Sequence, residues 1–154
     1  MTSPKALIVL LSLALAFPAF GQKRSTDQEV RTALATWNDR ANKADLVSFM
    51  ELFDDSSDLL VVGSAPGEVM KGKAAIRNWL SGLFAHNKFS WDLSNPIIDS
   101  SGDTAWVFLD GAMTVVNDKG ETHKSPYRFS GVMVKKNGAW KWRMFHGSIP
   151  EQEH

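Results

Sequence analysis

The residue whose type best suits proton transfer is His146, near the end of the last strand expected from the sequence. An imidazole titrates near neutral pH and can act as a general acid or base. Alternate residues of a strand point to one face, and His146 shares its parity with Trp140 and Trp142. We therefore expect His146 to line a pocket among large apolar side chains, as a catalytic or ligand-binding residue. The alternative is a hydrogen-bonded histidine that holds the end of the sheet.

Asp110 is the second candidate for proton transfer, because it interrupts the apolar stretch of residues 106–113. An isolated polar group among apolar side chains costs roughly 2–7 kcal/mol unless it is paired, and a charge costs more. If Asp110 is buried in a cavity, it becomes a general acid or base with His146. The dipeptide Asp110-Gly111 is equally typical of a turn or a β-bulge, which would place the carboxylate at the surface.

Arg128 and several tryptophans are candidates for binding rather than chemistry. The planar guanidinium of Arg128 can hold a ligand carboxylate, and the alternative is an ion pair with an acidic residue of the same domain. The sequence has six tryptophans, and we expect most of them in the core. Trp37 and Trp106 are expected to contact a ligand, together with Ser148, which has the parity of His146.

No metal or cofactor is expected. The histidines at positions 86, 123 and 154 lack metal-ligand spacing, and no helical partner stands three or four residues from His146. The stretch of residues 67–74 has the spacing of a phosphate-binding loop, but Ala74 replaces the hydroxyl residue that binds magnesium. We interpret this stretch as a turn before a helix.

The elements that must position these residues change character along the chain. Helical apolar spacing predicts a helix from Thr26 to about Lys43, with Thr26 and Glu29 as a capping box, and a short helix capped by Asp45. A strand is expected at 59–62 and a third helix at 73–85. From position 89 the period becomes two, which predicts strands at 89–98, 104–116, 127–136 and 139–146. Asn137-Gly138 indicates a type I′ hairpin between the last two.

Helices followed by antiparallel strands indicate an α+β fold, with three helices on one face of a bent sheet. A curved sheet wrapped around the first helix leaves a cavity at its open end, where ligands usually bind. We expect this cavity to take a small molecule.

Composition and the amino terminus restrict the functional classes further. The chain has 154 residues, with 17 Lys and Arg balanced by 17 Asp and Glu, so general nucleic-acid binding is not expected. It has no cysteine, which excludes disulfides and thiol chemistry. Residues 1–21 have the basic, apolar and small-residue order of a signal peptide, which predicts cleavage after Gly21 and a single domain at 22–154. The alternatives are a retained membrane anchor and an N-terminal core helix; after cleavage we expect no stable membrane association and a periplasmic or secreted location.

Several motifs, in this order, resemble the SnoaL-like branch of the nuclear transport factor 2 (NTF2) superfamily over residues 26–150. They are residues 42–46 (NKADL), 51–55 (ELFDD), 67–77 (GEVMKGKAAIR) and Trp140 followed by 145–150 (FHGSIP). The resemblance implies an NTF2-like cone, with three helices packed on a strongly curved antiparallel sheet that often forms a homodimer. It also implies that His146, within His-x-Ser-x-Pro, and Arg128 lie at positions typical of the family.

The superfamily includes ketosteroid isomerases, cyclases, dehydratases and association domains, so the fold does not decide the function. The isomerase mechanism fits poorly, because residues 59–63 offer no carboxylate base and Trp37 stands where that family has a tyrosine. We expect an exported protein that binds a small apolar or aromatic molecule. The alternatives are an isomerase, cyclase or dehydratase that uses His146, and a dimerising association module without a ligand.

Overall fold

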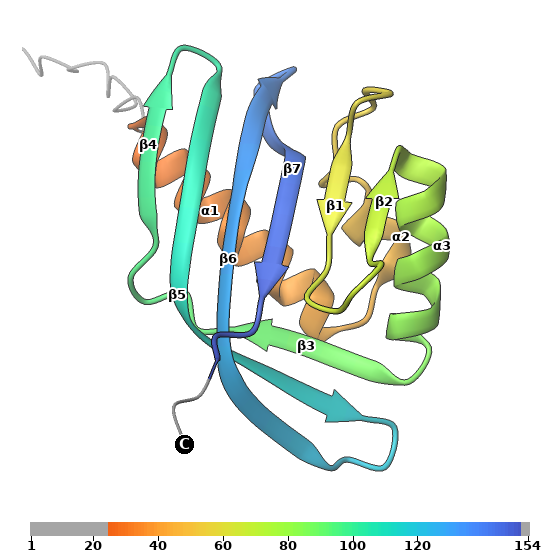
Figure 1. The fold of residues 1–154 in the computed structure, drawn as a ribbon. Helices are drawn as coiled ribbons and strands as arrows, with labels where there is room; N and C mark the ends of the chain where they lie inside the picture. Colours follow the sequence, from red (N-terminus) through yellow and green to blue (C-terminus); the bar gives the residue numbers. More distant parts are fainter. Residues whose placement is uncertain (1–24, 152–154) are drawn as a thin grey trace, which may run out of the picture.

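The computed structural model describes residues 25–151, and it has the expected α+β architecture with helices on one side of a strongly curved sheet (Figure 1). The elements are α1 (Thr26–Asn42), α2 (Leu46–Met50), β1 (Leu60–Val62), β2 (Val69–Lys71), α3 (Lys73–Phe84), β3 (Asn87–Trp91), β4 (Ile97–Ser101), β5 (Thr104–Asn117), β6 (Thr122–Lys136) and β7 (Ala139–Ser148).

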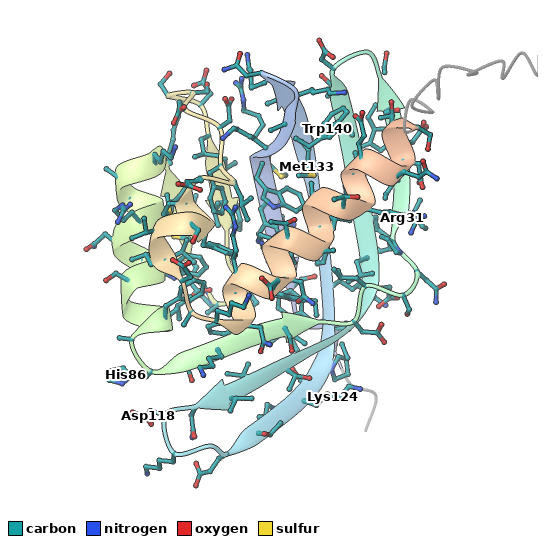
Figure 2. All side chains as sticks on the ribbon, turned by 180° about the vertical axis from the view of Figure 1, so that it is seen from behind. Arg31, His86, Asp118, Lys124, Met133 and Trp140 are labelled. Atoms are coloured by element: carbon teal, nitrogen blue, oxygen red, sulfur yellow. The ribbon has the colours of Figure 1, made fainter. Side chains whose placement is uncertain are left out.

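Helix α1 crosses the inner face of the sheet, as the view from behind shows (Figure 2). Its N-cap is Ser25, which exchanges hydrogen bonds with Gln28, so the capping box lies one residue before the expected one. The buried stripe consists of Val30, Leu34, Trp37 and Ala41. This stripe turns Trp37 toward the interior of the cone.

Helix α2 begins where the sequence predicts, since Asp45 accepts a hydrogen bond from the Ser48 backbone N–H at 3.1 Å. Helix α3 follows Gly72, whose φ of 81° lies in the left-handed region that glycine adopts without strain. Ile76 and Leu80 are the buried residues of α3. The third helix therefore closes one end of the cone through a narrow apolar face.

The strands are ordered β2-β1-β7-β6-β5-β3, and β4 also pairs with β5. All pairs are antiparallel except β1 with β7. The single strand expected at 89–98 was wrong: β3 pairs with the second half of β5 and β4 with the first half. One long, bent strand thus serves two partners, and this bend helps to make the cone.

The suggested turn at Asp110-Gly111 was also wrong. Asp110 pairs with Arg128 and Gly111 with Tyr127 in the continuous β5–β6 ladder. In contrast, the hairpin at Asn137-Gly138 is confirmed, with φ values of 51° and 79°. The two Xaa-Gly dipeptides therefore have different outcomes, because Gly111 stays within the β5–β6 ladder opposite Tyr127, whereas Asn137-Gly138 connects two strands.

A β-bulge in β7 changes which of its residues face inward. Trp142 is opposite Met133 and Met144 is opposite Val132, so Arg143 is an extra residue in β7. Before the bulge Trp140 and Trp142 are buried; after it the buried residues are Phe145 and Gly147.

The bulge is anchored to the segment after α2. Asp54 is buried and forms an ion pair with the Arg143 guanidinium at 2.6 Å, while the Asp54 backbone N–H donates to the Trp142 carbonyl at 2.8 Å. The extra residue therefore has a fixed position, with its side chain held outside the apolar core.

The predicted signal segment, residues 1–21, lies outside the described residues. Among residues 25–151, no helix combines the length and the apolar character that a membrane crossing requires.

Gly131 provides a test of the packing at the bulge. A Cβ built at Gly131 would overlap the Met144 carbonyl oxygen and lie 2.6 Å from the Trp142 ring. We expect Gly131→Ala to lower the free energy of unfolding by about 1–3 kcal/mol, because such overpacking forces the sheet to shift. Urea denaturation measures the change.

Gly82 on α3 is the matched control, since nothing lies within 4 Å of a Cβ built there. Gly82→Ala is expected to raise the stability by up to about 1 kcal/mol through helix propensity. Equal effects of the two substitutions would contradict the tight packing at Gly131.

Candidate functional site

A cavity of about 140 Å³ opens between the inner face of the sheet and the three helices. Nine of its sixteen lining residues are aromatic, and they come from elements far apart in the sequence. The aromatic lining consists of Trp37, Phe49, Phe53, Trp79, Phe84, Phe89, Trp91, Tyr127 and Phe145. The cone is therefore partly hollow, in agreement with the expectation from the curved sheet.

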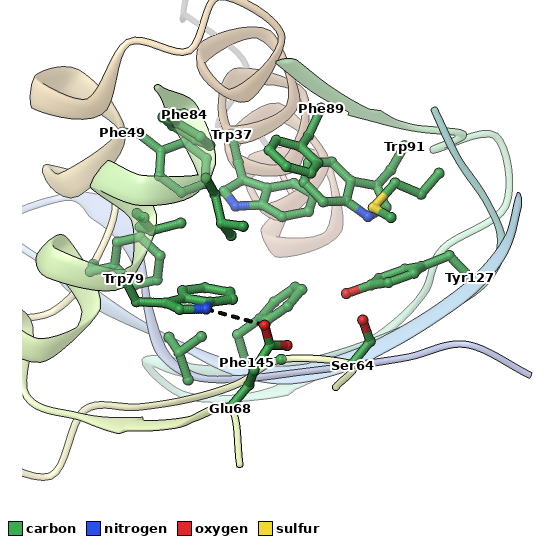
Figure 3. A pocket seen from close by; sticks show the side chains of 16 residues that line it. Trp37, Phe49, Ser64, Glu68, Trp79, Phe84, Phe89, Trp91, Tyr127 and Phe145 are labelled. Atoms are coloured by element: carbon green, nitrogen blue, oxygen red, sulfur yellow. Dashed lines mark hydrogen bonds between the residues drawn. The ribbon is translucent and has the colours of Figure 1, made fainter. Parts of the chain in front are cut away.

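One wall of the cavity is a row of rings from α1 and β3 (Figure 3). Trp37 and Trp91 stack with centroids 4.0 Å apart at an angle of 28°, and Phe89 continues the row 6.2 Å from Trp91. Phe145 reaches Trp37 at 5.6 Å from the sheet side. Such mutual packing fixes the rings before any ligand binds and leaves ring faces and edges toward the cavity.

Polar groups lie across the cavity from this row (Figure 3). Glu68, in the loop between β1 and β2, accepts hydrogen bonds from the Trp79 indole N–H at 3.3 Å and the Ala65 backbone N–H at 2.9 Å. A side chain at Gly63 would overlap the Glu68 carboxylate, so this glycine makes room for it. The loop thus holds a carboxylate at the edge of an apolar pocket.

Tyr127 places its hydroxyl at the same edge. Burial, followed by the negative charge of Glu68, raises the pKa of Tyr127 to about 12, while hydrogen bonding with Ser64 acts in the opposite direction. Gly147 leaves the space that the hydroxyl fills, because a Cβ there would overlap it. Tyr127 is therefore a neutral hydrogen-bonding group at physiological pH.

The Trp91 indole N–H is a further polar group of the cavity wall. It is buried, and no hydrogen-bond acceptor in residues 25–151 pairs with it. A buried donor without a partner costs about 1–3 kcal/mol.

Of the residues expected from the sequence, only Trp37 lines the cavity. The others share one face of the sheet, but it is the outer face. Asp110, Arg128 and Ser148 form one row across β5, β6 and β7. His146 lies in the next row along the strands, opposite Ser130. Trp106 lies in the row after that, opposite Val132.

The expected orientation of His146 and Ser148 was wrong because of the bulge at Arg143. Their parity with Trp140 and Trp142 holds only for a regular strand. The additional residue turns His146 outward, where it is exposed, and brings Phe145 inward.

Arg128 and Asp110 pair with each other at 3.0 Å on the outer face, which is the alternative considered for Arg128. The hydrogen bond and the charge of Asp110 raise the pKa of Arg128 above its ordinary value. Trp106 alternates with the buried Ala105 and Val107 and is therefore also directed outward. None of these three residues belongs to the cavity lining.

The sequence interpretation missed Tyr127 and Glu68. Tyr127 alternates with Arg128 and shares its parity with the buried Phe129, a pattern that could have placed the tyrosine on the inner face. Glu68 had no comparable signal, because its position depends on a loop rather than on a strand or helix. Within residues 25–151, no three potential ligands of His, Cys, Asp or Glu type gather into a metal site.

Comparisons with known proteins agree with this architecture. The SnoaL-like domain profile matches residues 30–152. No curated protein matches the sequence.

Three solved structures illustrate the similarity. An NTF2-like superfamily protein from Salmonella enterica serovar Typhimurium has a TM-score of 0.70 and 24% identity, over 82% of this chain and 92% of the other. A protein from Novosphingobium aromaticivorans, provisionally assigned as a scytalone dehydratase, has a TM-score of 0.71 and 18% identity, over 81% and 84%. A Xanthomonas campestris protein, provisionally assigned as a calmodulin-dependent kinase II association domain, has a TM-score of 0.71 and 17% identity, over 84% and 91%. At these identities they share the fold with this chain.

The raised pKa of Tyr127 can be measured directly, because it is the sole tyrosine of the sequence. Tyrosinate absorbance should report deprotonation near pH 12 in the folded protein and near pH 10 in the unfolded one. The unfolded state loses this proton first, so the Tyr127 contribution to the unfolding free energy falls as the pH rises from about 10 to about 12.

Glu68→Gln removes a negative charge and should lower the pKa of Tyr127 relative to the wild type. Glu151→Gln, at the exposed C-terminal end, is the matched control and should leave the titration unchanged. A folded protein whose tyrosine titrates near pH 10 would contradict this description of the site.

Proposed function

The chain belongs to the SnoaL-like domain family, and on this premise we propose that it binds a small apolar or aromatic molecule inside its cone. The observation that carries the proposal is the aromatic cavity of about 140 Å³. An engineered apolar cavity of about 150 Å³ in another protein binds benzene, so a single ring is a suitable size.

The polar groups of the cavity support a bound molecule rather than an empty defect of packing. The Tyr127 hydroxyl and the Glu68 carboxylate border one apolar space. A few placed polar groups in a largely apolar concavity are typical of small-molecule sites. We propose that these groups orient the ligand while the rings supply the apolar contact.

A catalytic role for His146 and Asp110 has lost its geometric basis. Both residues lie on the outer face, away from the cavity, and Asp110 is engaged by Arg128. Substrate bound in the cavity would be separated from both by the sheet. We therefore place binding ahead of isomerase, cyclase or dehydratase chemistry by this pair.

A second candidate function, association with another copy of the chain, is favoured by the outer face. On this face Phe108 of β5 lies opposite Ile97 of β4, and the two side chains are 39% and 66% exposed. The neighbouring Trp106 is 46% exposed. Adjacent exposed apolar side chains of this size are typical of protein interfaces. We propose that a homodimer buries this patch.

We also propose that the domain acts outside the cytoplasm, in the periplasm or the medium. The support is the order of basic, apolar and small residues in positions 1–21.

Filling the cavity tests the binding proposal. Leu83 lines the cavity from α3 and is partly buried, so Leu83→Trp would place an indole in the space of the ligand. We expect calorimetry with benzyl alcohol to show binding to the wild type and at least about tenfold weaker binding to Leu83→Trp, because steric exclusion removes the apolar contact.

Val47→Trp is the control for adding an indole, since Val47 is exposed on α2 outside the cavity. This variant should bind like the wild type. Unchanged affinity in Leu83→Trp would argue that the compound binds elsewhere.

Sedimentation velocity tests the homodimer. Phe108→Glu places a charge within the exposed apolar patch and should convert a dimer into a monomer, since an unpaired charge in an interface is costly. Val47→Glu, which replaces an exposed apolar residue on α2 outside the patch, should leave the dimer intact. A monomeric wild type at high concentration would reject the interface.

A further inference from the structure

The electrostatic character of the cavity restricts its ligand more narrowly than its apolar lining does. Glu68 is the sole charged residue among the sixteen that line it, and none of them is Lys, Arg or His. We propose that the cavity selects a small organic cation, an ammonium group carried on an apolar or aromatic body, with the ammonium at Glu68. This inference rests on the proposed binding function and adds the charge of the ligand.

The first argument is that the Glu68 carboxylate has only neutral partners. Its two oxygens accept one N–H each, from Trp79 at 3.3 Å and from the Ala65 backbone at 2.9 Å. No ion pair in the described part of the chain includes Glu68. These bonds fix the orientation of the carboxylate but leave its negative charge without a countercharge, which a bound ammonium would supply.

The second argument is the effect of the rings. An aromatic face carries negative potential, and a cation within about 6 Å of a ring centroid is attracted to it, most strongly by tryptophan. The cavity has three tryptophans in its lining, Trp37, Trp79 and Trp91, besides its other rings. Carboxylate and rings therefore favour the same sign of charge.

The third argument is the influence of Glu68 on its neighbour. Its negative charge contributes to the raised pKa of Tyr127, so the electrostatic potential of Glu68 extends to the Tyr127 hydroxyl. The same potential would repel an anionic ligand. Arg128, the residue expected to hold a ligand carboxylate, lies on the outer face and pairs with Asp110.

The test is a series of three ligands of nearly equal size: benzylammonium, benzyl alcohol and benzoate. Calorimetry at neutral pH and low salt should show benzylammonium binding at least about tenfold more tightly than benzyl alcohol, and benzoate most weakly. Tetramethylammonium, a cation without N–H donors, should compete with benzylammonium for the wild type, since ring faces and charge both attract it.

Glu68→Gln keeps the size of the side chain and the acceptor for the Ala65 N–H. In this variant benzylammonium and benzyl alcohol should bind within about twofold of each other, with the affinity for benzyl alcohol retained as proof of an intact cavity. Glu151→Gln, at the exposed end of the chain, removes the same charge elsewhere and should keep the full preference.

The outcomes separate the two proposals. If benzyl alcohol binds but the wild type shows no preference for the cation, or if the preference persists in Glu68→Gln, the cation selectivity is overturned and the binding function stands. If none of the three compounds binds to the wild type, both are overturned.

Discussion

The architecture of the site depends on one ion pair, between Arg143 in β7 and Asp54 after α2. At 2.6 Å, with the aspartate buried, it fixes the extra residue of a β-bulge and attaches the end of the helical layer to the middle of the sheet. Removing one partner of such a pair leaves an uncompensated buried charge, so the arrangement is held more firmly than a surface ion pair would be. Because side chains alternate along a strand, the bulge decides the direction of every residue that follows it in β7. Phe145 contributes to the cavity, and His146 faces outward, for this reason.

The two faces of the sheet consequently have different characters. The inner face joins a row of stacked rings to a few polar groups, whereas the outer face carries apolar residues next to the Arg128–Asp110 pair and His146. These faces meet different requirements, since a cavity needs partners for its buried polar groups and an interface needs an exposed apolar area. The proposed ligand inside the cone and the proposed second copy outside it would therefore use different residues. Exposure of His146 on the outer face agrees better with a position near an interface than with catalysis in the cavity.

The fold could be predicted from the sequence largely because its strongest signals are local. The apolar stripe of α1, the Asp45 cap and the Asn137-Gly138 hairpin each depend on a few neighbouring residues, and the structure confirms them. Strand parity also grouped His146 and Ser148 on one face correctly, but it assigned them to the wrong face. The assignment counted alternate residues from Trp140 to His146, but the extra residue Arg143 lies between them and inverts the alternation. The bulge depends on Asp54, which is far away in the sequence, so no local pattern indicated it.

The polar edge of the cavity was unpredictable for a related reason. Glu68 and Tyr127 become a site only when a loop, a helix and β6 converge, and each needs a glycine to make room, from the same loop for Glu68 and from β7 for Tyr127. Gly63 lies beneath the Glu68 carboxylate, and Gly147, on the inner face of β7, gives space to the Tyr127 hydroxyl. Gly147 faces inward only because the bulge precedes it, so the same displacement that moves His146 out of the cavity creates the space for Tyr127. The lining of the cavity thus depends on an irregularity in the sheet, and His146, the residue that looked most reactive in the sequence, is directed away from the cavity by it.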